Sequence, residues 1–378
     1  MINKITPIQI LLGIAILYLF LFTAHAIFLG KTVYGDGIFY YSWMRSVAID
    51  QDINFANEYA HYSVTQPLVH AGVVGNKYAV GFPLLLSPWY LITHTAVRED
   101  GYGFIYQFIT GLFSVLYVLT GIVLLYRSLN LYFSKFSSIL SVLSLALATN
   151  LLFYGSIDPI NSHSISFFLS ALLISILLSS NKTTFFSGLI VGLLASTRTQ
   201  DILFILLLVP FLTKKTILFT SLGIFFGFLP QLVAWFLLYG SVVSPYLSNG
   251  EGFMLSLFQI PQVLFSPNNG LFLWTPMALF GCIGLWFSSK ISHKFRWTIL
   301  FVFSLQVLLV GSWSTWWQGA SFSGRMFVSM LPILTLGMAS LFEKLHSQMK
   351  RMKYFLYIIP LGFGLINSIL IVYRLLLN

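Results

Sequence analysis

The stretch IQILLGIAILYLFLFTAHAIFL, residues 8–29, decides the fold class, because it is a long apolar run without a single charged side chain. A helix needs about 20 predominantly apolar residues to cross the hydrocarbon core of a bilayer. Similar runs recur through the whole 378-residue chain. We interpret eleven of them as membrane-spanning helices, at residues 8–29, 104–126, 136–154, 163–180, 184–196, 201–213, 216–239, 271–288, 297–313, 326–342 and 354–376.

The composition supports the same conclusion. Hydrophobic residues make up 57% of the chain and charged residues only 8%, whereas soluble domains carry roughly 25% charged residues. The net charge is +10, but the basic residues recur in short clusters between apolar runs, which excludes a nucleic-acid partner as well as a soluble enzyme. A lone cysteine, Cys282, excludes an internal disulfide. The sequence therefore predicts an all-α polytopic membrane helical bundle, as a single transmembrane domain over residues 1–378.

The charge distribution predicts an orientation. With the N-terminus in the cytoplasm and alternating spans, 13 of the 20 basic residues fall on the cytoplasmic side, as the positive-inside rule requires. Nine of the ten acidic residues fall on the other side, which that rule does not require. We therefore expect a functional site on the outer face, directed to the periplasm or exterior of the inner cell membrane.

Residues 30–103 form the longest connection, and connections of this length are usually functional or disordered. Residues 79–97 within it are apolar but interrupted by Pro83 and Pro88, which favours a re-entrant or interfacial segment and leaves a kinked span as the alternative. An amphipathic helix is also predicted, because apolar residues recur there at helical spacing, at Ile38, Tyr41, Met44, Val47 and Ala48. Further along, the short runs 184–196 and 201–213 predict a helical hairpin broken at residues 196–200.

Asp36 is the first candidate for chemistry. It lies between Gly35 and Gly37, which let the backbone turn sharply and leave the carboxylate reachable. Two interpretations stay open, a helix N-cap and a catalytic group, since Asp is also a favoured capping residue. Carboxylates further along, at Asp52 and Glu58, could form a solvated surface, hold sugar hydroxyls or bind a divalent cation. Their spacing matches no full metal-loop pattern, so no metal or other cofactor is assigned.

Three basic residues are candidates for binding a phosphate, because arginine presents a fork of donors that fits phosphate oxygens. Arg198 lies at the hairpin break, with a local pair to Asp201 as the alternative. Arg325 follows a Trp-rich loop, and Lys77 precedes the apolar segment 79–97. Interfacial anchoring is the alternative for both.

Weaker candidates for substrate binding share the predicted outer face and have side chains that bind sugar hydroxyls or stack on sugar rings. For Trp317 the alternative is an aromatic belt, and for His163 a structural role. These candidates are Asp52, Glu58, Tyr78, Asp158, His163, Glu251 and Trp317. No Walker-type phosphate loop, zinc-protease motif, nucleophile elbow or dinucleotide fingerprint is present.

The chain resembles the GT-C superfamily of polytopic glycosyltransferases, and within it the dolichyl-phosphate-mannose and aminoarabinose transferase-like group. The resemblance is carried, in order, by YGDGIFYYSWMRSVAIDQDINFANEY (34–59), GNKYAVGFPLLLSPWYLI (75–92), GLIVGLLASTRTQDILFILLLVP (188–210), LFSPNNGLFLWTPM (264–277) and WWQGASFSGRMFVSMLPIL (316–334). The resemblance implies a polyprenyl-phosphate sugar donor. Asp36 matches the catalytic Asp of the family, and Lys77 and Arg325 match the basic residues that contact the donor phosphate. Arg198 matches a recurrent basic position. The acidic stretch lacks an Asp-Glu pair at Asp36, which leaves metal dependence unassigned.

The residues suit such a reaction. A sugar on a polyprenyl phosphate already carries a good leaving group, an acceptor hydroxyl needs a base, and the departing phosphate needs fixed cations. The sequence thus predicts an inverting transferase with a lipid or glycan acceptor. The alternatives are a transporter or flippase of lipid-linked sugars and a polymerase or ligase of surface glycans.

Overall fold

The computed structural model describes residues 6–180, 182–247, 252–254, 259–319 and 321–376. These residues form helices joined by turns, with no strand among them beyond two isolated bridges. Seven helical stretches are long and apolar enough to cross a membrane: Pro7–Leu29, Phe104–Leu129, Ser162–Ser180, Ile217–Tyr239, His293–Gly311, Arg325–Gln348 and Tyr354–Leu376. The chain is therefore a helical membrane protein.

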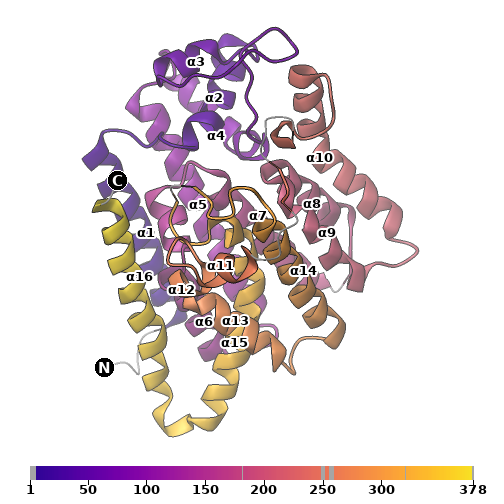
Figure 1. Ribbon diagram of the computed structural model, residues 1–378. Coiled ribbons are helices and arrows are strands. Elements are labelled where there is room, and N and C mark those ends of the chain that lie inside the picture. The colour runs from indigo at the N-terminus through magenta and orange to yellow at the C-terminus, as the bar shows by residue number, and fades with distance from the viewer. Residues whose placement is uncertain (1–5, 181, 248–251, 255–258, 320, 377–378) are drawn as a thin grey trace.

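The sequence predicts eleven spans, and seven of them correspond to helical stretches of full spanning length among the described residues. Four of the predicted spans correspond to helical stretches that are shorter than a full crossing, namely Lys135–Leu147, Phe185–Thr197, Thr199–Phe211 and Pro276–Trp286. The first described helix starts near the lower end of the bundle and the last finishes near its upper end (Figure 1). We use "upper end" below for the end that carries helices α2 (Gly37–Arg45), α3 (Ala56–His61) and α4 (Gly81–Val97), and "lower end" for the opposite one.

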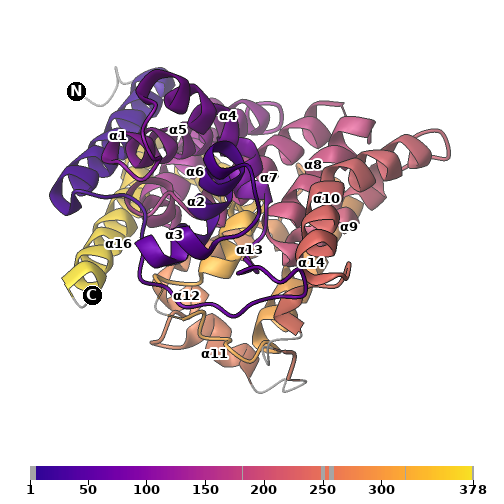
Figure 2. The ribbon, with the colours of Figure 1, turned by 90° about the horizontal axis from the view of Figure 1, so that it is seen from above.

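The upper end is built by the long connection after α1 (Pro7–Leu29). It contains α2 (Gly37–Arg45), which continues as a π-helix over Ser46–Asp50, then α3 (Ala56–His61) and α4 (Gly81–Val97). Residues 37–50 are thus helical where the sequence predicts an amphipathic helix. The loop that precedes α4 runs across the top of the molecule toward α10 (Ile217–Tyr239) (Figure 2), where the Ala71 N–H donates to the Leu238 carbonyl.

Helix α4 is continuous where the two prolines suggest an interrupted segment. Pro83 lies in the first turn, where backbone N–H groups have no intrahelical partner in any case. Pro88 has no N–H to donate to the Leu84 carbonyl, so the helix loses one internal hydrogen bond there. Packing against α2, α5 (Phe104–Leu129) and α8 (Phe185–Thr197) supports the helix along its length.

The bundle below has two heavily buried helices at its centre, α7 (Ser162–Ser180) and α15 (Leu331–Gln348). α7 packs along α5 (Phe104–Leu129), and α15 packs along α13 (Pro276–Trp286). The most exposed spans are α1, α10 and α16 (Ile358–Leu376), which present their apolar side chains outward. The remaining helices are α6 (Lys135–Leu147), α8 (Phe185–Thr197), α9 (Ile205–Leu208), α11 (Ile260–Phe265), α12 (Leu271–Trp274) and α14 (His293–Gly311).

Helices α8 (Phe185–Thr197) and α10 pack closely, because each carries two glycines four residues apart. Gly188 and Gly192 of α8 face Gly223 and Gly227 of α10, and a β-carbon at any of them would collide with the backbone of the other helix. Small residues at this spacing allow membrane helices to approach closely. The pair matters for the site below, because Arg198 directly follows α8.

We expect Gly192→Leu to destabilise the fold, since a β-carbon there would lie 2.8 Å from the Gly227 backbone. Overpacking of a tight contact costs about 1–3 kcal/mol, so the thermal unfolding midpoint in detergent should fall by several degrees. Gly13→Leu is the matched control, because a β-carbon at Gly13 meets nothing within 4 Å. Equal midpoints for the two variants would contradict the close packing of α8 on α10.

Candidate active site at the upper end

Asp36 lies in the turn that leads into α2. It occupies the N-cap position but has helical backbone angles and makes no side-chain cap. Instead its carboxylate accepts hydrogen bonds from the Tyr78 hydroxyl at 3.0 Å and from the Arg325 guanidinium at 2.7 Å. The side chain is 35% exposed. The geometry therefore decides against the capping interpretation and directs the carboxylate toward other groups.

Arg325 begins the short 3₁₀ helix Arg325–Met330 that leads into α15. Its backbone is held firmly, because the Asn150 amide donates to the Gly324 carbonyl at 3.1 Å and the Met326 N–H donates to Gln318 at 2.8 Å. The guanidinium is 24% exposed. Only Nη1 reaches Asp36, while Nε is buried without a hydrogen-bond partner among the described residues. Arg325 thus has donors left for a ligand.

Arg198 follows α8 in an extended conformation, at the hairpin break that the sequence predicts. Its guanidinium donates to the Ser162 hydroxyl at 3.1 Å and to the His163 ring at 2.8 Å, and it also contacts the Met326 sulfur. Asp201 is not its hydrogen-bonding partner, since that carboxylate accepts from Ser329 at 2.8 Å. Arg198 therefore contacts Met326, the residue that follows Arg325. The Nε of Arg198 is also buried without a hydrogen-bond partner in the described part of the chain.

Tyr40 is a member of this group that the sequence analysis missed. It lies one helical turn after Asp36 on α2 and is buried. Burial raises the pKa of its hydroxyl, and the charges of Arg198, Asp36 and Arg325 act on it as well. The spacing of four residues from Asp36 is the signal that sequence reasoning could have used.

Asp158 places a second carboxyl near Asp36, in the connection that precedes α7. Burial, together with the negative charge of Asp36, raises the pKa of Asp158 to about 7. Below neutral pH this carboxyl is therefore mostly protonated and able to donate a hydrogen bond, whereas an ionised carboxylate only accepts. His163, the neighbouring candidate, is 3% exposed and faces Arg198 and the Tyr154 ring, which fits a structural role.

Lys77 and Tyr78 precede α4 on the same side of the molecule. The Lys77 ammonium lies 4.8 Å from the centre of the Tyr246 ring, which in turn meets the Tyr78 ring edge-on. Tyr78 stacks on Phe39 at 4.3 Å while its hydroxyl holds Asp36. Trp317 lies on the loop before Arg325 with its ring 38% exposed. Glu251 lies outside the described residues.

Two acidic candidates, Asp52 and Glu58, do not contact Asp36. Asp52 lies beyond the far end of the α2 helix, where it accepts from the Ser46 hydroxyl at 2.8 Å and the Asn54 N–H at 3.0 Å. Glu58 is fully buried and joins Asp50 around the Arg45 guanidinium, at 2.7 and 2.5 Å. This buried ion cluster was missed in the sequence, although Arg45 is a basic residue among the apolar positions of a predicted amphipathic helix.

The ion cluster makes stability depend on pH. Burial raises the pKa of Glu58 from its ordinary 4.5 to about 7, so between these values the native state holds a proton that the unfolded chain has released. The contribution of Glu58 to stability therefore falls as the pH rises from about 4.5 to 7, and then levels off. We expect Glu58→Gln to remove this dependence, because glutamine resembles the protonated acid.

Thermal unfolding of both proteins at pH 5 and pH 8 measures the effect. The midpoint of Glu58→Gln relative to wild type should rise between the two pH values, whereas the exposed Glu99→Gln should track the wild type. A constant difference between Glu58→Gln and wild type would contradict a raised pKa at Glu58.

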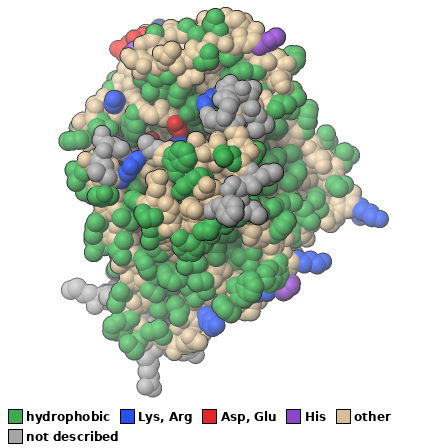
Figure 3. Space-filling view, in the orientation of Figure 1, with side chains coloured by type: hydrophobic (Ala, Val, Ile, Leu, Met, Phe, Trp, Pro, Cys, Tyr) green, Lys and Arg blue, Asp and Glu red, His purple; other side chains and the backbone are tan. Residues whose placement is uncertain are grey.

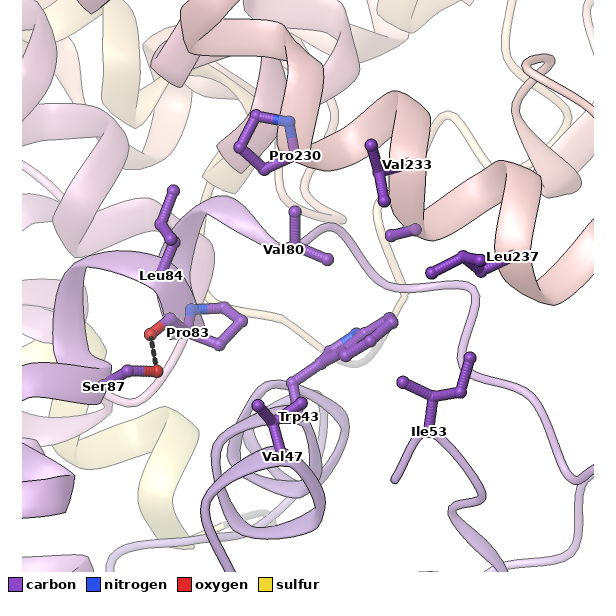
Figure 4. Close-up of a pocket in the computed structure, with 11 residues that line it drawn as sticks. Trp43, Val47, Ile53, Val80, Pro83, Leu84, Ser87, Pro230, Val233 and Leu237 are labelled. Atoms are coloured by element: carbon purple, nitrogen blue, oxygen red, sulfur yellow. Dashed lines mark hydrogen bonds between the residues drawn. The ribbon is translucent and has the colours of Figure 1, made fainter. Parts of the chain in front are cut away.

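An apolar groove of about 300 Å³ opens next to the site, between α2, α4 and α10. Figure 4 shows Trp43 and Val47 facing Val80 and Pro83 at the start of α4, with Val233 and Leu237 of α10 opposite. The groove is linked to Asp36 through one residue: the Trp43 indole donates to the Tyr78 carbonyl at 3.1 Å, and the Tyr78 hydroxyl donates to Asp36.

Within the described ranges, no group of three or more His, Cys, Asp or Glu side chains is placed to hold a metal ion. Comparison with known proteins adds no identification, since no protein-family model matches the chain and no curated protein matches it. The functional argument therefore depends on the geometry of the upper end.

Proposed function

We propose that the chain is an integral membrane glycosyltransferase that moves a sugar from a polyprenyl-phosphate donor to an acceptor hydroxyl. The supporting observation is the pairing of Asp36 with Arg325, 289 positions apart, at 2.7 Å in a partly exposed place. A base for the acceptor and a cation for the phosphate are the two groups that this reaction needs side by side.

In the proposed reaction, Asp36 accepts the proton of the acceptor hydroxyl as its oxygen attacks the anomeric carbon. The bond from that carbon to the phosphate oxygen breaks, and polyprenyl phosphate leaves with the electron pair. The transition state has oxocarbenium character, as in glycoside hydrolysis. Attack from the face opposite the phosphate inverts the anomeric centre.

The arginines support the phosphate part of the proposal. Arg325 has unused donors while it holds Asp36, and Arg198 beside it has an unused Nε. Arginine binds phosphate oxygens through parallel N–H groups. A phosphate at this place competes with Asp36 for Arg325, so donor binding itself would free the carboxylate to act as a base.

The apolar groove at Trp43 and Leu237 supports a lipid donor. Its lining is almost entirely hydrophobic, which suits an isoprenoid chain that gains free energy by burying apolar surface. The groove adjoins the Asp36 site through Tyr78, so a tail in the groove would leave its phosphate near the arginines.

Purified protein in liposomes with a radiolabelled polyprenyl-phosphate sugar tests the proposal. Transfer predicts cleavage of the sugar–phosphate bond, with the label moving to a new lipid or glycan product and free polyprenyl phosphate accumulating. A transporter or flippase would instead move the label across the bilayer with that bond intact, and this result would overturn the assignment.

A further inference from the structure

The lower end of the bundle contains a second cavity, of about 740 Å³. It lies between the ends of α5 and α7, the segment Val209–Phe211, and the loop that joins α13 to α14. α7 begins beside Arg198 and ends at this cavity, and its 19 residues span roughly 28 Å. The cavity is therefore separate from the Asp36 site and lies at the opposite end of the molecule.

The lining of this lower-end cavity is basic and rich in hydroxyl groups. Lys290, His293 and Arg296 contribute to it, together with Ser179, Ser289 and Ser292, and no acidic residue is among the lining side chains. Ser292 caps α14, whose first turn borders the cavity and adds the positive end of a helix dipole. On the face shown in Figure 3, acidic side chains appear only in the upper half, whereas basic and histidine side chains appear in both halves.

Arg296 is the residue best placed to bind an anion. One of its terminal nitrogens donates to the Ser288 carbonyl, which fixes the guanidinium. Its Nε is buried without a hydrogen-bond partner among the residues described. The charge of Lys290 acts on Glu343, but the Glu343 carboxylate accepts hydrogen bonds from the N–H and hydroxyl of Ser134 at 3.1 and 2.7 Å. Among the residues that the structure describes, no carboxylate is hydrogen-bonded to Lys290 or Arg296.

Exposed aromatic rings surround this region. Trp286, Phe287 and Trp297 are 56%, 62% and 38% exposed, and Trp297 lies 5.8 Å from the Arg296 guanidinium. Tryptophan is enriched where a membrane protein meets the interface between lipid and water. A cavity at that depth is open to the headgroups of membrane lipids.

We propose that the lower-end cavity binds the phosphate of an anionic membrane lipid, with Lys290 and Arg296 as the charged contacts. Basic cavities between membrane helices bind anionic headgroups in this way. The alternative source of the same chemistry is free phosphate in solution. The proposal is independent of the glycosyltransferase assignment, since it uses none of the residues around Asp36.

The test uses the full chain in nanodiscs of phosphatidylcholine with increasing phosphatidic acid, and measures binding of a fluorescent phosphatidic acid. Lys290→Gln combined with Arg296→Gln should weaken binding about 30-fold, since each of the two cations near anionic lipid contributes about 1 kcal/mol. Lys214→Gln combined with Lys215→Gln is the matched control, because it removes the same charge from a loop that does not line the cavity.

Equal losses in the two double variants would overturn the proposal, because they would indicate a general charge effect. A second measurement adds inorganic phosphate at 10 mM to the protein with bound fluorescent phosphatidic acid. The phosphate should displace little of the lipid. Full displacement would contradict the proposal that the ligand is a lipid and would favour free phosphate. Lys290→Gln alone, at an exposed position, should still weaken binding and covers the case in which the double variant does not fold.

Discussion

Replacement of Asp36 by asparagine is expected to lower the rate of sugar transfer by about 10²–10⁴-fold, the range that general-base catalysis typically contributes. Asparagine keeps the shape of the side chain and one acceptor oxygen, which can face either Tyr78 or Arg325, but it cannot take a proton from the acceptor. Initial rates of release of polyprenyl phosphate, at saturating donor and acceptor, measure the loss in kcat.

We expect the Asp36→Asn protein to fold as the wild type does. A partly exposed ion pair contributes only about 0–1 kcal/mol, and Asp36 is 35% exposed. Glu99→Gln removes a carboxylate from an exposed position in the connection between α4 and α5, and it should retain wild-type transfer. An Asp36→Asn protein with unchanged kcat and an unchanged elution profile would remove Asp36 from the mechanism.

Arg325→Ala is expected to act first on the donor, because the guanidinium is the cation that faces Asp36 and has donors to spare. A hydrogen bond to a charged group contributes about 1.5–3 kcal/mol, so kcat/KM for the donor should fall by about 10–100-fold. The KM for the acceptor should stay nearly constant. Steady-state kinetics with each substrate varied in turn separate the two effects.

Two further variants sharpen this result. Arg325→Lys keeps the charge but loses the planar fork, so it should recover only part of the donor affinity. Arg127→Ala removes an exposed arginine at the end of α5 and should leave both KM values unchanged. A change confined to the acceptor KM in Arg325→Ala would contradict a role in binding the donor phosphate.

The helices were predictable from the sequence because apolar length and turn residues act locally. Residues 163–180 and 216–239 were expected to be helical, and the structure gives Ser162–Ser180 and Ile217–Tyr239. The break at residues 196–200 was also predictable, since Arg198 interrupts an apolar run. α4 was harder to predict, because the disruptive effect of Pro83 and Pro88 depends on their position within the helix and on its packing.

The site could be predicted only as a set of separate candidates. Sequence reasoning singled out Asp36 and Arg325, but their contact depends on how α2 packs on α4 and how the segment before α15 packs on α7, which no local pattern encodes. For the same reason, no local pattern shows that Glu58 is inaccessible to a substrate. Its burial against Arg45 results from tertiary folding of the connection after α1.

The most direct test of the glycosyltransferase proposal is a structure of the protein in nanodiscs with bound polyprenyl phosphate. The proposal predicts that the phosphate lies within hydrogen-bond distance of the Arg325 guanidinium, that Asp36 is released from Arg325, and that the isoprenoid chain enters the groove beside Trp43. A phosphate bound elsewhere, with the 2.7 Å Asp36–Arg325 pair intact, would contradict it.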